Sequence, residues 1–511
     1  MSEHGCGLRR GATVTAGKNG NGWQESSGVR RLVILPLLAL AIAAACSDDN
    51  GGGRGDAKGD SGELPASAGP ATDAELPTSI APPPAGNGVP SSSASVAGAP
   101  GAVDLAAQGY IEEEFIVSGT ANVYRYGADG AVEVDREGVP YATRILIRRP
   151  QSPRRFSGNV HVETSHPQYG FNVVWSQTFD YVLANGDAYV SITTRRTNNG
   201  SSAIEGLEAF DPVRYAPLDF TEDGLNWDII GQVGRLLKTE TPDNPLRDFD
   251  VGRLYASGWS GGGALLLLYI SDGFHDRARM PDGAPIFDGY LVGEPSPYPR
   301  INSTAAELPE SDERQQVQPR DVPAISLHTH PQEEYRRRPD GNGPNDRYRV
   351  YEVAGGAHGD IRALGGISDL DCTYEVSRFP MHHLFKSTLE RLDAWAAHDE
   401  TPPRSKRLTL ARDGSVKLDQ HGNPRGGVRT TYIEVPTARY VAEAGSGLAC
   451  GRLLGGGQEP FPPEKLASLY KSHDDYVRKV TRLVQRFERE GWLLPADARA
   501  VRGEAVRSDI P

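Results

Sequence analysis

The sequence predicts an α/β protein in which one mainly parallel sheet is covered by helices on both faces. Three observations lead to this prediction. Strand and helix patterns alternate along the chain from about residue 110, several predicted strands are continuous apolar runs, and one strand meets an apolar helix at a glycine-rich turn. The chain has 511 residues, of which 38% are hydrophobic and 24% charged, so it can bury the core of one large domain.

The predicted elements follow in chain order. Strands are expected at 115–126, 141–147, 158–162, 188–193, 251–256, 287–292, 324–327 and 348–353. Helices are expected at 225–238, 264–270 and 384–397. Residues 428–435 are expected to be extended, and 463–490 to be one long charged helical region. We interpret the part after the last strand as a C-terminal extension packed on the same domain.

The N-terminal residues 1–45 are predicted to be a lipoprotein-type signal peptide. Arg30 and Arg31 precede an apolar run that ends in small residues, and the run is too short for a transmembrane helix. Small residues directly before Cys46 resemble a bacterial lipobox, although Ala43 stands where leucine is more common. We therefore expect lipidation of Cys46 and a membrane anchor in the bacterial cell envelope, with Ser47 favouring the outer membrane. Secretion without modification of Cys46 is the alternative.

Composition divides the rest of the chain. Residues 46–107 are rich in Gly, Ser, Pro and Ala and poor in large apolar residues, so we expect a disordered tether there. The globular domain is then expected to span 108–511. The formal net charge is −13, and no segment gathers Lys and Arg as a nucleic-acid footprint does, so nucleic acid is excluded as a partner.

The four cysteines are expected to have separate fates. Cys6 leaves with the signal peptide and Cys46 carries the lipid. Cys372 and Cys450 remain in an oxidising compartment, so we predict a disulfide between them. Two separate buried thiols are the alternative.

The strongest local signal for chemistry is Gly258-Trp259-Ser260-Gly261-Gly262, which fits the pattern G-x-S-x-G. It follows a predicted strand and opens a predicted helix, as in a nucleophile elbow, where small neighbours permit a strained serine. The N–H of Gly261 would face a developing oxyanion at the helix N-terminus. The alternative is a tight turn with an inert serine.

Ser260 needs a base and an acid, which in enzymes with such an elbow follow in the order serine, acid, histidine. His358 follows the strand at 348–353 among small residues and is the predicted base. His382 and His383 are rivals, but we expect them to be exposed or to cap a helix. Glu333, or alternatively Glu334, is the predicted acid that orients His358.

The second oxyanion donor is expected in the loop after the strand at 158–162. A backbone N–H of Thr164, Ser165 or His166 can serve, and the sequence does not choose among them. No cofactor is implied.

Two other classes of function compete with a serine enzyme. His328 and His330, with nearby glutamates and the pair His358 and Asp360, offer ligand types for a metal-dependent hydrolase, but their spacing fits no specific metal motif. A binding lipoprotein that keeps the fold without turnover is the other alternative.

Several longer motifs resemble a family of exported bacterial proteins with an alpha/beta hydrolase domain, from about Ile111 to Arg507. The motifs are SGTANVYRYG (118–127), RFSGNVHVET (155–164), FDPVRYAPL (210–218), GWSGGG (258–263), YEVAGGAHGD (351–360) and GNPRGGVR (422–429). Related chains often have an acidic Thr-Glu-Thr-Asp-like segment after the penultimate strand, where this chain has Thr329-His330-Pro331-Gln332 and then Glu333.

The resemblance implies an α/β-hydrolase fold with Ser260 and His358 as nucleophile and base. Together with the local motifs, it predicts an exported serine hydrolase that cleaves small carboxylic esters. The identity of the ester is left open, because pocket shape and not fold decides it.

Overall fold

The computed structural model describes residues 72–73, 75–197, 202–295, 299–332, 336–366, 370–441, 444–446, 450–451 and 455–510. They belong to one compact unit, Gly52–Pro511. The expected signal peptide, Cys46, and the expected acids Glu333 and Glu334 lie outside the described residues.

A ten-stranded sheet forms the centre of this unit, in the order β11-β12-β10-β9-β7-β5-β6-β4-β3-β2. Neighbouring strands from β12 to β6 are parallel, as predicted. These parallel strands are β5 (Asn159–Thr164), β6 (Ala188–Ile192), β7 (Arg253–Trp259), β9 (Gly289–Gly293), β10 (Ala324–His328) and β12 (Asp346–Glu352). Their continuous apolar sequences follow from burial on both faces of the sheet.

The two edges of the sheet are antiparallel. On one side β4 (Val132–Pro150) pairs with β6, and a long hairpin joins it to β3 (Tyr110–Tyr126), which pairs with β2 (Ser79–Ala81). On the other side β11 (Gly341–Gly343) pairs with β12. The short strands β1 (Thr72–Asp73) and β8 (Ala278–Arg279) pair separately.

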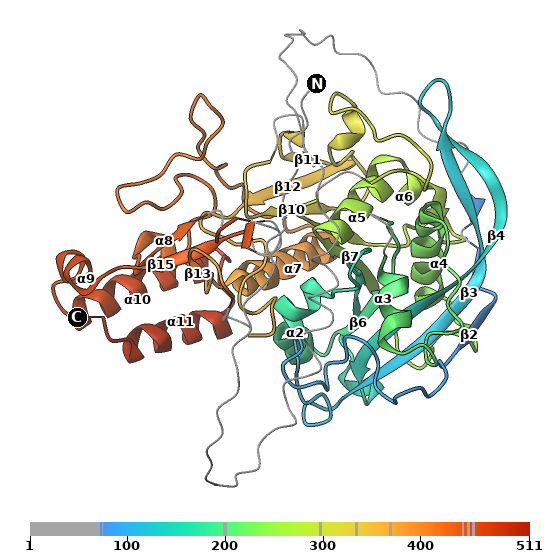
Figure 1. Ribbon diagram of the computed structural model, residues 1–511, viewed down its shortest axis with the longest axis horizontal. Coiled ribbons are helices and arrows are strands. Elements are labelled where there is room, and N and C mark those ends of the chain that lie inside the picture. Colours follow the sequence, from blue (N-terminus) through green and yellow to red (C-terminus); the bar gives the residue numbers. More distant parts are fainter. Residues whose placement is uncertain are drawn as a thin grey trace, which may run out of the picture. The chain divides into compact units, whose positions relative to one another are not determined.

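Helices cover both faces of the sheet (Figure 1). The helices α2 (Val173–Asn185) and α7 (Met381–His398) pack together and against β7 and β9, respectively, in one apolar core. The helices α4 (Asn226–Lys238) and α5 (Gly261–Ser271) belong to the second core. Every residue of α5 is buried, which explains its uniformly apolar sequence. The other elements here are the helices α3 (Ala203–Phe210) and α6 (Phe274–Arg277) and the 3₁₀ turns Pro153–Arg155, Asp223–Leu225 and Glu313–Gln315.

The segment 75–107 corrects the predicted tether, because it is folded onto the domain. Besides β2, it contains Ser93 and Ala94, which are 1% and 2% exposed. Arg148 of β4 donates to the carbonyl of Ser92 (2.6 Å), and Glu112 of β3 accepts from the N–H of Ala94 (3.0 Å). Composition did not reveal this order, because buried charged side chains of other strands hold the segment through its backbone.

The C-terminal extension also differs from expectation in detail. Residues 428–435 are not an extended strand, because they contain the helical turn α8 (Thr431–Glu434). The predicted long helix is broken into α9 (Pro463–Leu469) and α10 (His473–Arg489), where Ser472 caps α10 by accepting from the N–H of Asp475. The helices α10 and α11 (Pro495–Arg507) share a separate small core.

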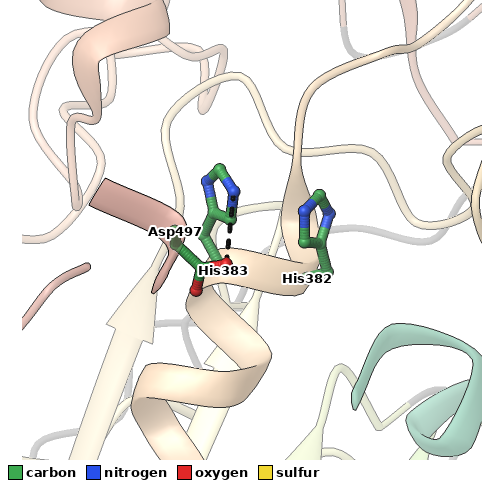
Figure 2. A group of neighbouring side chains, drawn as sticks. All are labelled: His382, His383 and Asp497. Atoms are coloured by element: carbon green, nitrogen blue, oxygen red, sulfur yellow. Dashed lines mark ion pairs between the residues drawn. The ribbon is translucent and has the colours of Figure 1, made fainter. Parts of the chain in front are cut away.

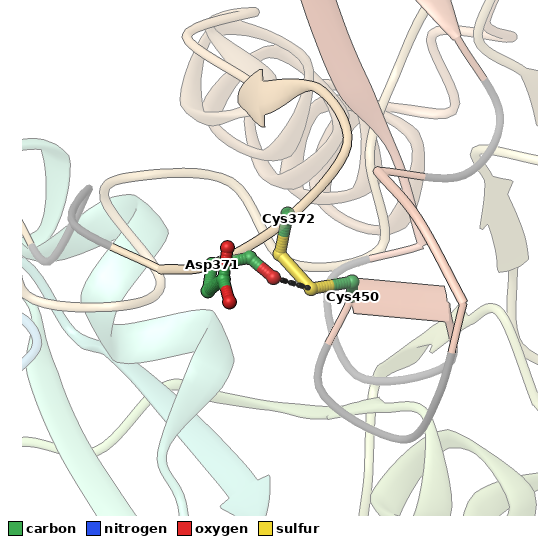
Figure 3. The surroundings of a disulfide bond; sticks show 3 residues. All are labelled: Asp371, Cys372 and Cys450. Atoms are coloured by element: carbon green, nitrogen blue, oxygen red, sulfur yellow. Dashed lines mark hydrogen bonds between the residues drawn. A yellow bond between two sulfur atoms is a disulfide. The ribbon is translucent and has the colours of Figure 1, made fainter.

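A second small sheet lies in the extension, in the order β13-β15-β14. Its strands are β13 (Glu375–Val376), β14 (Ala438–Val441) and β15 (Gly457–Pro460). The predicted disulfide between Cys372 and Cys450 is present beside it, with Cα atoms 5.6 Å apart (Figure 3). The bond joins parts of the chain separated by 78 residues.

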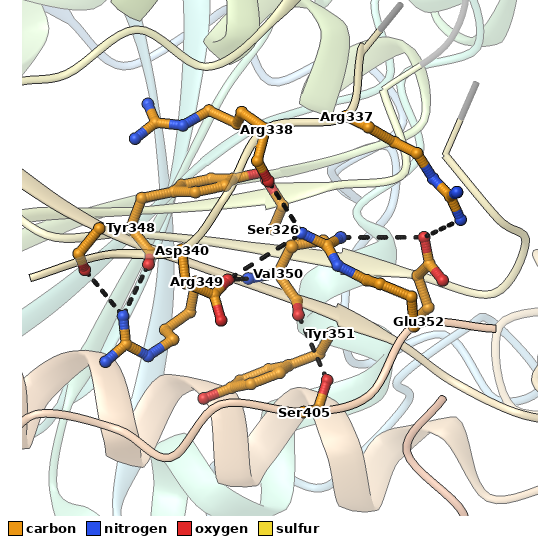
Figure 4. Close-up of polar contacts among 12 residues, drawn as sticks. Ser326, Arg337, Arg338, Asp340, Tyr348, Arg349, Val350, Tyr351, Glu352 and Ser405 are labelled. Atoms are coloured by element: carbon orange, nitrogen blue, oxygen red, sulfur yellow. Dashed lines mark hydrogen bonds and ion pairs between the residues drawn. The ribbon is translucent and has the colours of Figure 1, made fainter. Parts of the chain in front are cut away.

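Buried polar contacts attach the extension to β12. Glu352, the last residue of β12, accepts from the N–H groups of Gln332 (3.2 Å) and Leu408 (2.6 Å), and Arg337 is directed at it (Figure 4). Val350, two residues earlier in β12, is anchored in the same way, because the hydroxyl of Ser405 donates to its carbonyl. Glu352 therefore holds together the loop that follows β10 and the segment that follows α7. No helix among the described residues is long and apolar enough to cross a membrane.

Candidate active site

The turn between β7 and α5 holds Ser260 in a strained conformation. Its φ is 56° and its ψ is −118°, a region that residues other than glycine seldom adopt. The N–H of Ser260 donates to the carbonyl of Gly293 (2.9 Å), and its carbonyl accepts from Ala264 (2.9 Å). Such strain persists only where the surrounding structure imposes it, and it is typical of functional sites. The predicted nucleophile elbow is therefore present in its backbone geometry.

Close backbone approaches explain the glycines of this turn. A Cβ on Gly262 would lie 2.3 Å from the carbonyl oxygen of Thr164, and one on Gly263 would lie 2.2 Å from that of Gly293. A Cβ on Gly258 would meet the carbonyl group of Gly262 at 2.5 Å. The glycines of the motif are therefore needed because β7 and α5 pack closely on the neighbouring strands.

His358 lies in the loop after β12, as predicted, and contacts made by both halves of the chain fix it. Its N–H donates to the carbonyl of Gly455 (3.2 Å), which belongs to the C-terminal extension. Its own carbonyl accepts from the indole N–H of Trp259 (3.0 Å), and the two rings lie 5.5 Å apart. The extension therefore shapes the position of the histidine.

The carboxylate that reaches His358 is Glu294, directly after β9. Its Oε2 lies 3.1 Å from Nδ1 of His358 and accepts from the hydroxyl of Thr329 (2.5 Å). Its Oε1 accepts from the N–H of His330 (3.1 Å) and lies 2.7 Å from Nδ1 of the same residue. Glu294 has a φ of 36°, a second strained residue at this edge of the sheet.

Burial alone would raise the pKa of Glu294, but His330 and His358 together hold it well below its usual range. The carboxylate is therefore ionised, and it can orient an imidazole and stabilise its protonated form.

The sequence-based choice of acid fell elsewhere, on Glu333 and Glu334, which lie outside the described residues. Glu294 was missed because the acid was sought only after β10. A signal was available, since Glu294 follows the strand predicted at 287–292, and β9 pairs with the nucleophile strand β7. Adjacent parallel strands end at the same edge of a sheet, so an acid there is within reach of the elbow.

Ser260 and the pair of His358 and Glu294 meet at this edge. The residue that accepts from the Ser260 N–H, Gly293, directly precedes Glu294, and the residue before Ser260 is the tryptophan that contacts His358. Within the described ranges no hydrogen bond joins the Ser260 hydroxyl to His358. In enzymes without substrate such bonds are often long and tighten only in the reacting complex.

The expected oxyanion loop after β5 lies against the elbow. The hydroxyl of Thr164, the last residue of β5, donates to the carbonyl of Gly262 (3.0 Å), so this side chain holds the turn against the end of β5. The N–H of Ser165 donates to the carbonyl of Ile192 (3.1 Å) and that of His166 to Phe171 (2.9 Å). Those two N–H groups are already hydrogen-bonded, which corrects the expectation for Ser165 and for His166. The N–H groups of Thr164 and Gly261 stay predictions.

The histidines considered for a metal site have other partners. His328 is buried beside the Gln332 amide (3.1 Å between nitrogen atoms), and burial lowers its pKa to about 4. His330 faces Glu294, and Asp360 accepts from the amide of Gln177 (2.8 Å). These contacts give the metal alternative no support.

A different group, His382, His383 and Asp497, brings three potential ligand atoms within 4.8 Å of one another in the described part of the chain (Figure 2). The two histidines begin α7 as expected, but His383 is 4% exposed, so the expectation of an exposed side chain was wrong for it. Lys386 donates to Asp497 at 2.5 Å. Its ammonium already balances the carboxylate and would repel a cation, so we assign this group to docking α11 on α7.

Comparisons with known proteins agree with this architecture. Residues 79–503 match a family model described as alpha/beta hydrolase domain, a range that begins inside the segment first expected to be a tether. No curated protein matches the chain.

Solved structures similar to this chain include three esterases. Esterase Est22 is 14% identical, with a TM-score of 0.24, over 40% of this chain and 48% of its own. A thermostable esterase from Pseudomonas putida is 12% identical, with a TM-score of 0.24, over 44% and 65%. Brefeldin A esterase, a bacterial homologue of human hormone-sensitive lipase, is 14% identical, with a TM-score of 0.20, over 35% and 40%.

The match thus spans about half the length of Est22. The family model covers most of the chain, and the mostly parallel sheet agrees with its description. This protein therefore belongs to the alpha/beta hydrolase domain family and has the alpha/beta hydrolase fold, a mostly parallel sheet flanked by helices.

Proposed function

We propose that this protein is a serine hydrolase that cleaves carboxylic esters with Ser260, His358 and Glu294. The observation that carries the proposal is the position of Glu294. Its ionised carboxylate contacts Nδ1 of His358 and directly follows Gly293, the residue bonded to the backbone of Ser260. A strained serine, an imidazole and a buried carboxylate at one sheet edge are the parts of a nucleophilic triad.

In the proposed reaction the Ser260 hydroxyl attacks the ester carbonyl while His358 takes its proton through Nε2. Glu294 keeps the Nδ1 proton of His358 in place and stabilises the imidazolium. The Gly261 N–H donates to the oxyanion that forms. His358 then protonates the leaving alkoxide, and a water molecule, deprotonated by His358, hydrolyses the acyl ester on Ser260.

Labelling with a fluorophosphonate probe tests this proposal. The parent protein should form an adduct on Ser260 and hydrolyse a short-chain nitrophenyl ester, and Ser260→Ala and His358→Ala should lose both. Matched controls are Ser468→Ala, at an exposed serine of α9, and His421→Ala, in the hairpin region 408–428, which should behave like the parent. A parent without adduct and turnover would favour the binding lipoprotein, and turnover abolished by chelators but retained in Ser260→Ala would favour a metal enzyme.

We also propose that the protein is exported and held in a bacterial envelope through lipid on Cys46. The signal layout of residues 1–45 and the disulfide, which requires an oxidising compartment, support this. Expression in a bacterial host with labelled palmitate should label the parent protein, and Cys46→Ser should remove the label. An unlabelled parent that is recovered free of membranes would contradict lipidation.

A further inference from the structure

The loop that should complete the oxyanion hole has few backbone donors to offer. The N–H groups of Ser165 and His166 are bonded to Ile192 and Phe171, and Pro167 has no N–H. The next N–H, that of Gln168, donates to Nδ1 of the His166 ring (3.3 Å). The loop after β5 therefore directs a side chain, and not these N–H groups, at the elbow.

The bond from Gln168 determines which nitrogen of His166 carries the proton. An Nδ1 that accepts a hydrogen bond has no proton, so a neutral ring carries it on Nε2. Burial, with His358 and Arg196 nearby, lowers the pKa of His166 to about 3, so the ring is neutral at neutral pH. Nε2–H is therefore a hydrogen-bond donor whose proton does not titrate between pH 5 and 8.

The Nε2 donor of His166 lies beside the turn that carries Ser260. Nε2 of His166 lies 3.2 Å from where a Cβ on Gly261 would stand, and the ring stacks on Tyr169 with centroids 4.8 Å apart. Gly261 is expected to supply the first oxyanion donor, so the imidazole, together with Pro167 (Cδ 2.9 Å from that Cβ position), packs against the residue that carries this donor. The stacking keeps the ring in place before a substrate arrives, which is what an oxyanion donor needs.

We propose that His166 is a catalytic residue that donates Nε2–H to the oxyanion, next to the N–H of Gly261. The inference rests on the proposed function and adds a residue outside its triad. A neutral donor suits this place, because a second cation would oppose the protonation of His358 during the attack. The ligand class remains a carbonyl oxygen that gains negative charge in the transition state.

Three variants test the assignment on the full chain. His166→Phe keeps an aromatic ring for stacking but removes the donor, His166→Gln keeps a donor, and His421→Phe makes the same exchange in the hairpin region 408–428, outside the site. We expect His166→Phe to lower kcat for a nitrophenyl ester about 10²- to 10³-fold with little change in KM, because one oxyanion donor contributes to the transition state by about this factor. His166→Gln should regain at least part of that loss, and His421→Phe should resemble the parent.

The outcomes separate this inference from the proposed function. A His166→Phe variant that still labels Ser260 stoichiometrically, though slowly, and keeps the parent's pH profile supports the oxyanion role. Activity within a few-fold of the parent would overturn it, and so would His166→Gln as inactive as His166→Phe. Complete loss of labelling, as in His358→Ala, would make His166 the base. If the parent itself is not labelled on Ser260, the proposed function fails, and this inference fails with it.

Discussion

Replacing Glu294 by glutamine tests the least expected part of the site. The amide has nearly the shape of the carboxylate, so the change alters charge and hydrogen bonding more than packing. In the parent, the Glu294 carboxylate accepts hydrogen bonds from the hydroxyl of Thr329 and from the backbone N–H of His330. It also accepts from Nδ1 of His330 and from Nδ1 of His358. An amide has only one oxygen, so its NH₂ group must face some of these donors.

The expected cost follows from the tautomer of His358. If an NH₂ group faces Nδ1, the ring moves its proton to Nε2 and offers Ser260 a proton in place of a lone pair. In a serine protease the equivalent acid-to-amide change lowers kcat about 10⁴-fold. We expect a loss of about 10³- to 10⁴-fold here, which corresponds to about 4–5.5 kcal/mol of transition-state stabilisation. Unsatisfied buried donors should also lower the free energy of unfolding by about 1–3 kcal/mol.

The assay is steady-state hydrolysis of a nitrophenyl ester, with thermal unfolding measured on the same samples. Glu333→Gln and Glu334→Gln are the matched comparisons, because they remove the acids that the sequence favoured, and both should keep activity close to that of the parent. A Glu294→Gln variant that is folded and as active as the parent, while Glu333→Gln is inactive, would refute the assignment of Glu294.

Three further changes test the fold around the site. Gly262→Ala should lower the free energy of unfolding by about 3 kcal/mol, because its Cβ would lie 2.3 Å from a backbone oxygen. The control Gly206→Ala, at an open position inside α3, should be neutral or stabilising in the same denaturant titration. Equal losses in the two variants would contradict the contact argument. Burial raises the pKa of Asp272 to about 7 from 3.8, so the folded state prefers the protonated acid, and stability should fall as pH rises from about 4 to about 7 and then level off. In Asp272→Asn that dependence should weaken, and an unchanged stability–pH curve would refute the shift. Cys372→Ser should lower unfolding stability by about 2–4 kcal/mol, and reduction of the parent should do the same; an unchanged melting temperature in both would show that the disulfide contributes nothing.

Some features could be predicted because they depend on short stretches of chain. Ser260 was found because a Cβ on Gly258, Gly262 or Gly263 would lie 2.2–2.5 Å from neighbouring backbone atoms, so only glycine fits and a local pattern results. The parallel strands were found because burial on both faces demands continuous apolar runs. His358 followed from chain order after the last of these strands, among residues small enough for a tight loop.

Other features escaped because distant residues decide them. The helix α2 was missed, since its buried surface extends around much of its circumference and leaves little helical periodicity. The segment 75–107 looked too polar to fold, yet Arg148 and Glu112, which lie 56 and 18 residues from their partners, bind its backbone. Local composition carries no information about partners that the fold brings from other strands.

The sequence by itself determined the fold class, the nucleophile turn, the histidine and the cysteine pair, because spacing, periodicity and the small size of glycine act within a few residues. Only the tertiary structure decided which carboxylate contacts His358 and which N–H groups of the loop after β5 are already bonded. Glu294 and His358 follow different strands, and they contact each other because parallel strands end at one edge. Which acid reaches the histidine there depends on strand order in the sheet, and strand order is a property of the folded chain.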